Sequence, residues 1–84
     1  MPVLSRFYGI VIRMYYSQSE HNPPHIHAIY GEDMVVVDIR SRKILEGEFP
    51  PKALSMVKEW VEMNEVALME IWSTQRFKML PPLK

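Results

Sequence analysis

The chain has 84 residues, of which 48% are hydrophobic and 24% charged, with ten basic and ten acidic side chains and no cysteine. This length supports one hydrophobic core, so we expect a single domain over residues 1–84, and the composition excludes an intrinsically disordered chain. The lack of cysteine favours a reducing compartment, and neither a signal peptide nor an apolar run of about 20 residues is visible, which predicts a cytoplasmic protein without a membrane span.

The first predicted element is one long strand over residues 6–16, because this segment is dense in β-branched and aromatic side chains. Gly9 within the run suggests a bulge or the close approach of another backbone. Alternation predicts that one face of the strand looks toward the core, and that this face consists of Tyr8, Ile10, Ile12, Met14 and Tyr16.

Three shorter strands are predicted after a polar loop, at residues 25–30, 34–40 and 43–49. The pair Pro23-Pro24 delivers the chain in an extended conformation into the first of them. Turns are expected at Gly31 and near Ser41-Arg42, and the second turn lacks an Asn-Gly or Asp-Gly signature.

Beyond Pro50-Pro51 the hydrophobic period changes from two to about 3.6, which predicts helix. Asn64 is either the N-cap of a second helix or a polar position in one longer helix, and we favour two helices. Trp60 and Trp72 are expected to lie over the core. The predicted fold is therefore α+β, an antiparallel meander of three to four strands followed by two C-terminal helices on one face.

All three histidines lie within seven residues, in the segment His21-Asn-Pro-Pro-His25-Ile-His27. Successive strand residues point to opposite faces, so His25 and His27 share a face. A first hypothesis is a divalent metal site with His21, His25 and His27 as candidate ligands. The spacing also leaves other residues open as the third ligand, namely Glu20, Asp38 and Glu48.

A second hypothesis is metal-free acid-base chemistry on a phosphodiester, with His25 and His27 exchanging protons and Arg6 or Arg13 stabilising the charged transition state. A third interpretation is structural: the prolines and histidines form a rigid, self-hydrogen-bonded turn that fixes the strand register. The residue pattern leaves all three open.

A basic cluster of Arg40, Arg42 and Lys43 falls at the predicted turn between the last two strands. Such a cluster can follow a phosphate backbone when aromatic side chains interleave with it, and here none do. The formal net charge of zero and the nearby Glu46 and Glu48 favour a solvated cluster over a nucleic-acid site.

Zero net charge and seven methionines favour self-association or a protein partner. Met56, Met63 and Met69 recur at helical spacing, which is typical of core filler or of a partner-facing patch. We therefore expect a homo-oligomer or a complex with a cognate small protein, and we favour neither a nucleic-acid partner nor a metal cofactor.

The order of several motifs resembles the domain of unknown function 4160 family of small bacterial proteins. The most specific motif is His21-Asn-Pro-Pro-His-Ile-His-Ala28, placed after Ser5-Arg-Phe-Tyr-Gly-Ile-Val-Ile-Arg-Met-Tyr-Tyr16 and before Ile44-Leu-Glu-Gly-Glu48 and the Trp60 helix. The resemblance implies a gene that lies beside another small domain in a two-gene, toxin-antitoxin-like cassette, and it assigns no site residues. We expect an interaction or regulatory module; the alternatives are a histidine-dependent enzyme and a weak nucleic-acid binder.

Overall fold

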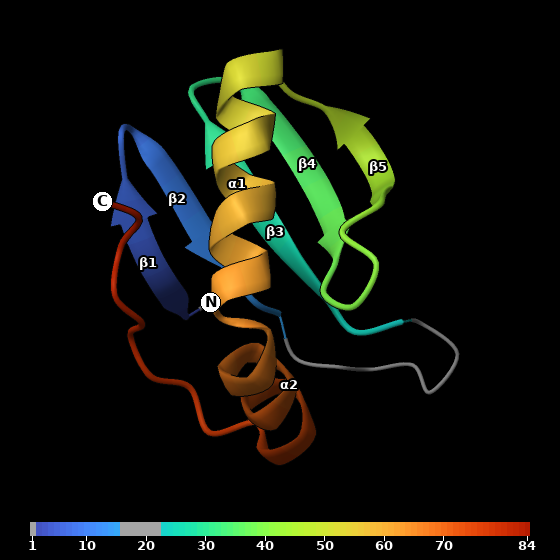
Figure 1. The fold of residues 1–84 in the computed structure, drawn as a ribbon, viewed down its shortest axis with the longest axis vertical. Coiled ribbons are helices and arrows are strands. Elements are labelled where there is room, and N and C mark those ends of the chain that lie inside the picture. Colours follow the sequence, from blue (N-terminus) through green and yellow to red (C-terminus); the bar gives the residue numbers. More distant parts are fainter. Residues whose placement is uncertain (1, 16–22) are drawn as a thin grey trace.

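The computed structural model describes residues 2–15 and 23–84 and shows an α+β fold. One antiparallel sheet has the strand order β1-β2-β3-β4-β5, and two helices follow it in sequence (Figure 1). This architecture confirms the predicted meander with C-terminal helices. The sheet has five strands rather than three to four, because the first predicted strand is in fact two.

The long strand predicted over residues 6–16 is wrong. The chain forms β1 (Val3–Phe7) and β2 (Ile10–Arg13), which pair antiparallel across a turn at Tyr8 and Gly9. Both turn residues have positive φ, 49° and 80°, as the tightest hairpin connections require. Gly9 therefore closes a hairpin, and Tyr8 is 61% exposed rather than part of the core.

The remaining strands lie close to their predicted positions, as β3 (His25–Tyr30), β4 (Asp33–Asp38) and β5 (Ile44–Glu48). Alternation gives the three central strands of the sheet a core-facing set of side chains, whereas every residue of β5 is exposed. The buried sets on β2, β3 and β4 are Ile10 and Ile12, Ile26 and Ala28, and Val35 and Val37.

Helix α1 (Pro51–Met63) lies across one face of the sheet, and α2 (Glu65–Thr74) continues past the ends of the strands (Figure 1). Pro51 stands in the first turn of α1, as predicted. The break falls at Asn64, which confirms two helices. Asn64 does not cap α2 through its side chain, because its Nδ2 donates a hydrogen bond back to the Trp60 carbonyl, 2.9 Å away.

Trp60 lies in the middle of the core, 1% exposed, with its ring centroid 5.9 Å from that of Phe7. The C-terminal segment after α2 has no helix or strand, and it is anchored along β1 (Figure 1). The Leu80 amide donates to the Leu4 carbonyl at 2.7 Å, and the Trp60 indole donates to the Pro81 carbonyl at 2.8 Å. The tail therefore covers part of the outer edge of β1, whereas β5 forms the opposite edge of the sheet.

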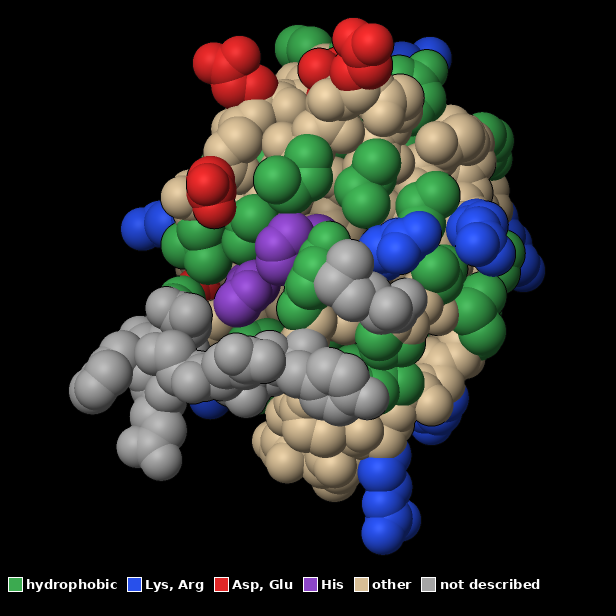
Figure 2. Space-filling model, turned by 180° about the vertical axis from the view of Figure 1, so that it is seen from behind, with side chains coloured by type: hydrophobic (Ala, Val, Ile, Leu, Met, Phe, Trp, Pro, Cys, Tyr) green, Lys and Arg blue, Asp and Glu red, His purple; other side chains and the backbone are tan. Residues whose placement is uncertain are grey.

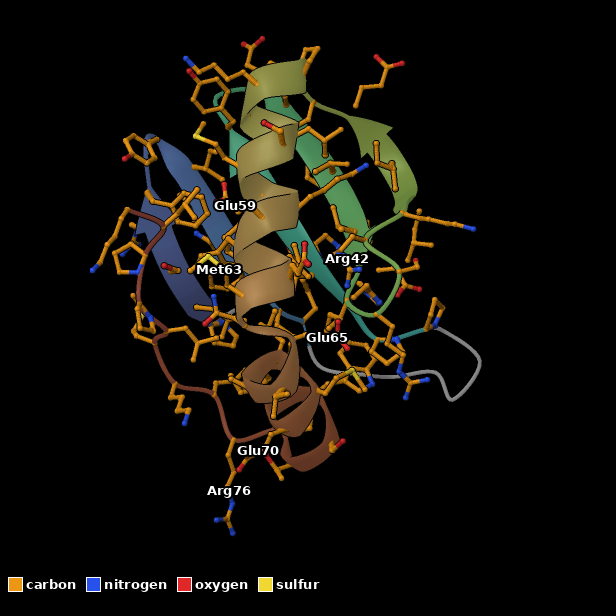
Figure 3. All side chains as sticks on the ribbon, in the orientation of Figure 1. Arg42, Glu59, Met63, Glu65, Glu70 and Arg76 are labelled. Atoms are coloured by element: carbon orange, nitrogen blue, oxygen red, sulfur yellow. The ribbon has the colours of Figure 1, made fainter. Side chains whose placement is uncertain are left out.

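The start of α2 is tied to the connection between β4 and β5. Arg42 and Glu65 point toward each other (Figure 3), and their Nη1 and Oε1 atoms are 2.9 Å apart. Both side chains are partly exposed, at 30% and 41%, so this pair contributes no more than about 1 kcal/mol to stability. Its main consequence is positional, because it holds the turn against the helix.

Among the described residues, no helix or strand forms a layer over the sheet face opposite α1, although Trp72 of α2 packs against His25 at one end of this face. Figure 2 shows hydrophobic side chains and the histidines on this face, with Lys and Arg mainly to the right of them and also at the left edge, and acidic side chains to the left and above. We call this surface the open face. Within the described residues, neither helix has the length and apolar character that crossing a membrane requires.

Candidate functional site

The strand β3 places His25 and His27 on the open face, while Ile26 between them is fully buried on the core side. The two imidazole centroids are 5.3 Å apart, with the rings edge to face. His25 and His27 therefore share one face of the sheet, as strand alternation predicts. The two rings form one side of a candidate site.

His25 is held by the proline pair that precedes it. Its Nδ1 lies 2.8 Å from the Pro23 carbonyl oxygen, which can only accept a hydrogen bond, so Nδ1 carries the proton. The Nε2 atom of the neutral ring then keeps its lone pair for a ligand or a proton. The ring also packs against Trp72 of α2, with centroids 5.0 Å apart.

His27 lies deeper, beneath Tyr15, whose ring centroid is 4.1 Å away. Burial lowers the pKa of His27 below its ordinary value of 6.5, the neighbouring charge of His25 lowers it further, and Glu46 acts in the opposite direction. Its Nδ1 atom is buried without a hydrogen-bond partner among the residues described. The neutral ring is therefore favoured at neutral pH.

A hollow of about 240 Å³ opens between the histidines and β5. It combines the imidazole nitrogens with one carboxylate and two aliphatic side chains, so a group that donates hydrogen bonds and carries an apolar portion fits its chemistry. The lining residues are Pro23, His25, His27, Val36, Leu45 and Glu46.

Of the two arginines proposed for acid-base chemistry, only Arg13 is beside the histidines. The β2–β3 register pairs Arg13 with His27, whereas Arg6 pairs with Val11 in the next row of the sheet. The Nε atom of Arg13 is buried and has no partner within the described part of the chain. His25, His27 and Arg13 can together exchange protons and stabilise a negative charge.

Two of the candidate metal ligands, His21 and Glu20, lie outside the residues that the structure describes. Asp38 pairs with His25 in the β3–β4 register, but its Oδ1 accepts the backbone N–H groups of Arg40 and Ser41, at 2.8 and 3.0 Å. Across residues 2–15 and 23–84, no group of three histidine, aspartate or glutamate side chains is arranged to hold a metal ion. A metal site in this chain stays a prediction.

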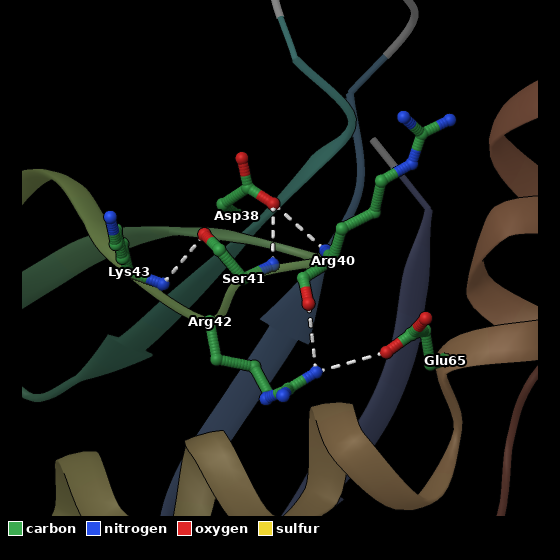
Figure 4. A network of polar contacts seen from close by, with 6 residues as sticks. All are labelled: Asp38, Arg40, Ser41, Arg42, Lys43 and Glu65. Carbon is green, nitrogen blue, oxygen red and sulfur yellow. Dashed lines mark hydrogen bonds and ion pairs between the residues drawn. The ribbon is translucent and has the colours of Figure 1, made fainter.

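The basic cluster of Arg40, Arg42 and Lys43 is not a continuous patch (Figure 4). The Nη1 atom of Arg42 donates to the Arg40 carbonyl and to Glu65, each at 2.9 Å. Arg40 and Lys43 are exposed. The Arg42 guanidinium therefore closes the turn, which leaves it poorly placed for a phosphate.

Sequence reasoning missed several neighbours of the histidines. Tyr15 could have been found, because alternation puts it on the same side of its strand as Arg13. Leu45 and Glu46 could not, since a shift in the β4–β5 register between Val36 and Val37 decides where they point. Trp72 packs against the core, as expected, and it also contacts His25, which the sequence did not indicate.

Comparison with known proteins gives one match. The family model described as domain of unknown function (DUF4160) matches residues 9–73, which is most of the chain and includes the histidine segment. Neither a curated protein nor a solved structure gives a match.

Proposed function

The chain belongs to the family described as domain of unknown function (DUF4160), and we propose that it acts as an interaction module that docks a small protein on the open face of its sheet. The partner is a second copy of the chain or the protein encoded by the neighbouring gene of a two-gene, toxin-antitoxin-like cassette. The protein would then have a regulatory role, because the partner that occupies the open face determines which of the two complexes forms.

The observation that supports this proposal is the exposure of apolar side chains on the open face. Met34 on β4 and Leu45 on β5 are 40% and 45% exposed, and Val11 and Ile29 lie in the same cross-strand row as Met34. Sheets in small domains normally bury such a row against another layer. Docking of a protein would supply that layer and add apolar burial to a small core.

The experiment is to measure the molar mass of the purified chain by size-exclusion chromatography with light scattering, alone and mixed with the protein encoded by the neighbouring gene. We expect a species heavier than the monomer in at least one of the two samples. A chain that stays strictly monomeric and also ignores that protein would contradict the proposal.

A second candidate function is histidine-dependent cleavage of a phosphodiester. It is supported by His25 and His27, which line one hollow, and by Arg13, which is the cross-strand neighbour of His27. Two imidazoles of which one is held neutral can act as base and acid, and the guanidinium can stabilise the charged transition state. RNA is the simplest substrate class for this chemistry, because its 2′-hydroxyl serves as the nucleophile.

This candidate predicts that the chain cleaves single-stranded RNA and that His25→Ala or His27→Ala lowers the rate by a factor of about 100 or more. The matched control is Arg6→Ala, which removes a cation of the open face one row away from the histidines. Circular dichroism verifies that each variant is folded. RNA left intact by the wild type, or cut equally well by the histidine variants, would end the case for this function.

A further inference from the structure

We propose that the open face binds a second copy of this chain face to face, with the arginine side of one copy lying over the glutamate side of the other. This inference rests on the proposed function and names its partner. It follows from the way charge is distributed across the strands.

The strand registers arrange the open face in rows that cross all five strands. Each row carries a cation near β1 and an anion on β5, with apolar side chains or histidine between them. The first row is Arg6, Val11, Ile29, Met34 and Glu48, and the second is Val3, Arg13, His27, Val36 and Glu46. Figure 2 shows red side chains to the left and above and blue side chains mainly to the right, with blue also at the left edge. Lys43 is exposed directly before β5, so the acidic strand also has a cation beside it.

The opposite charges of the first row, Arg6 on β1 and Glu48 on β5, are too far apart to neutralise each other within one chain. Five strands spaced about 4.8 Å apart place β1 and β5 roughly 19 Å from each other. This separation is about twice the Debye length of ~8 Å at physiological ionic strength. Arg6 and Glu48 of one chain are therefore available to ligands on the open face.

Symmetry converts this separation of charge into a self-complementary surface. A two-fold axis parallel to the strands lays β1 of one copy over β5 of the other, so Arg6 of each copy meets Glu48 of the other, and Arg13 on β2 lies one strand away from the facing Glu46. An axis perpendicular to the strands would instead lay arginine over arginine. The expected dimer is a sandwich of two aligned sheets about 10 Å apart, crossed by about 30° because of their twist.

The same charges argue against pairing of two copies through their β5 edges. An antiparallel β5–β5 ladder would bring Glu46 and Glu48 of the two copies close together, and like charges on facing strands are destabilising. The open face is thus the better surface for a second copy.

The experiment uses charge reversal at the two exposed ends of the first row. We expect the wild type to be a reversible dimer that dissociates as salt is raised, measured by sedimentation equilibrium. Arg6→Glu alone and Glu48→Arg alone should each raise the dimer dissociation constant by about tenfold or more, because each variant sets like charges against one another at both ends of the interface. An equal mixture of the two variants should dimerise again, since every contact then joins opposite charges.

The matched controls are Arg76→Glu and Glu59→Arg, which make the same charge changes at exposed positions beyond the open face (Figure 3). They should leave the dissociation constant unchanged. A wild type that is monomeric up to about 1 mM, single variants that dimerise normally, controls that weaken the dimer equally, or a mixture that stays monomeric would each overturn the inference. A monomeric wild type that still binds the protein of the neighbouring gene would overturn only this inference and leave the proposed function standing.

Discussion

The environment of His27 changes how tightly its ring binds a proton. Desolvation beneath Tyr15 and the proximity of His25 lower its pKa, while Glu46 opposes them. The neutral ring presents nitrogen lone pairs rather than a positive charge to the hollow beside it. A ligand of this site at neutral pH therefore meets an acceptor of hydrogen bonds.

The lowered pKa predicts how stability depends on pH. Because folded His27 binds a proton less tightly than unfolded His27, its contribution to stability is fully present above pH 6.5 and is lost as the pH falls from 6.5 through the folded pKa. Urea denaturation between pH 5 and pH 8 should show this loss in the wild type. His27→Gln should reduce it, because glutamine does not titrate, and an unchanged pH dependence in that variant would contradict the assignment.

The pairing of His25 with His27 was predictable from the sequence, because strand alternation is a local property. The partners of the two rings were not. The hydrogen bond from His25 to Pro23 depends on the ring's rotamer, and the approach of Trp72 depends on where α2 lies past the strand ends. Residue patterns indicate which side chains share a face, whereas the identity of their neighbours is decided by packing.

Among the elements, the wrong prediction concerns the strand that contains Gly9. The run of β-branched and aromatic residues over 6–16 gives no sign of the β1–β2 hairpin, because Tyr8 is not a residue that favours positive φ. The shift in the β4–β5 register lies between Val36 and Val37, and residue patterns do not predict it. The helices were easier to predict, since Pro51 and the change of period mark their start.

The different surroundings of Gly31 and Gly47 predict that the same substitution to alanine has unequal effects on stability at these two positions. A Cβ at Gly47 would overlap the Met34 carbonyl oxygen, whereas a Cβ at Gly31 meets nothing within 4 Å. Both have positive φ, so Gly31→Ala should cost about 1 kcal/mol of unfolding free energy from backbone strain alone, and Gly47→Ala about 3 kcal/mol. Equal losses in urea denaturation would show that β5 tolerates a side chain at position 47.

At the scale of the whole molecule, the sheet has one face covered by α1 and one face without a layer among the described residues. The methionine content and zero net charge predict association, and we propose the open face as the surface for it. Met56 and Met69 pack against the core, as filler, while Met34 lies on the open face. The separation of charge across the face depends on strand register, so it could not be predicted from composition.

The central claim is that the open face, and not the helical side, is the docking surface. The most direct measurement compares Met34→Lys with Met63→Lys, because both positions are exposed, at 40% and 69%, and only Met34 lies on the open face. Light scattering should show that Met34→Lys weakens assembly with a second copy or with the protein of the neighbouring gene by at least about tenfold, since docking would bury the new charge. Met63→Lys should assemble like the wild type. Assembly that survives Met34→Lys and fails in Met63→Lys would place the docking surface on the helices and contradict the account.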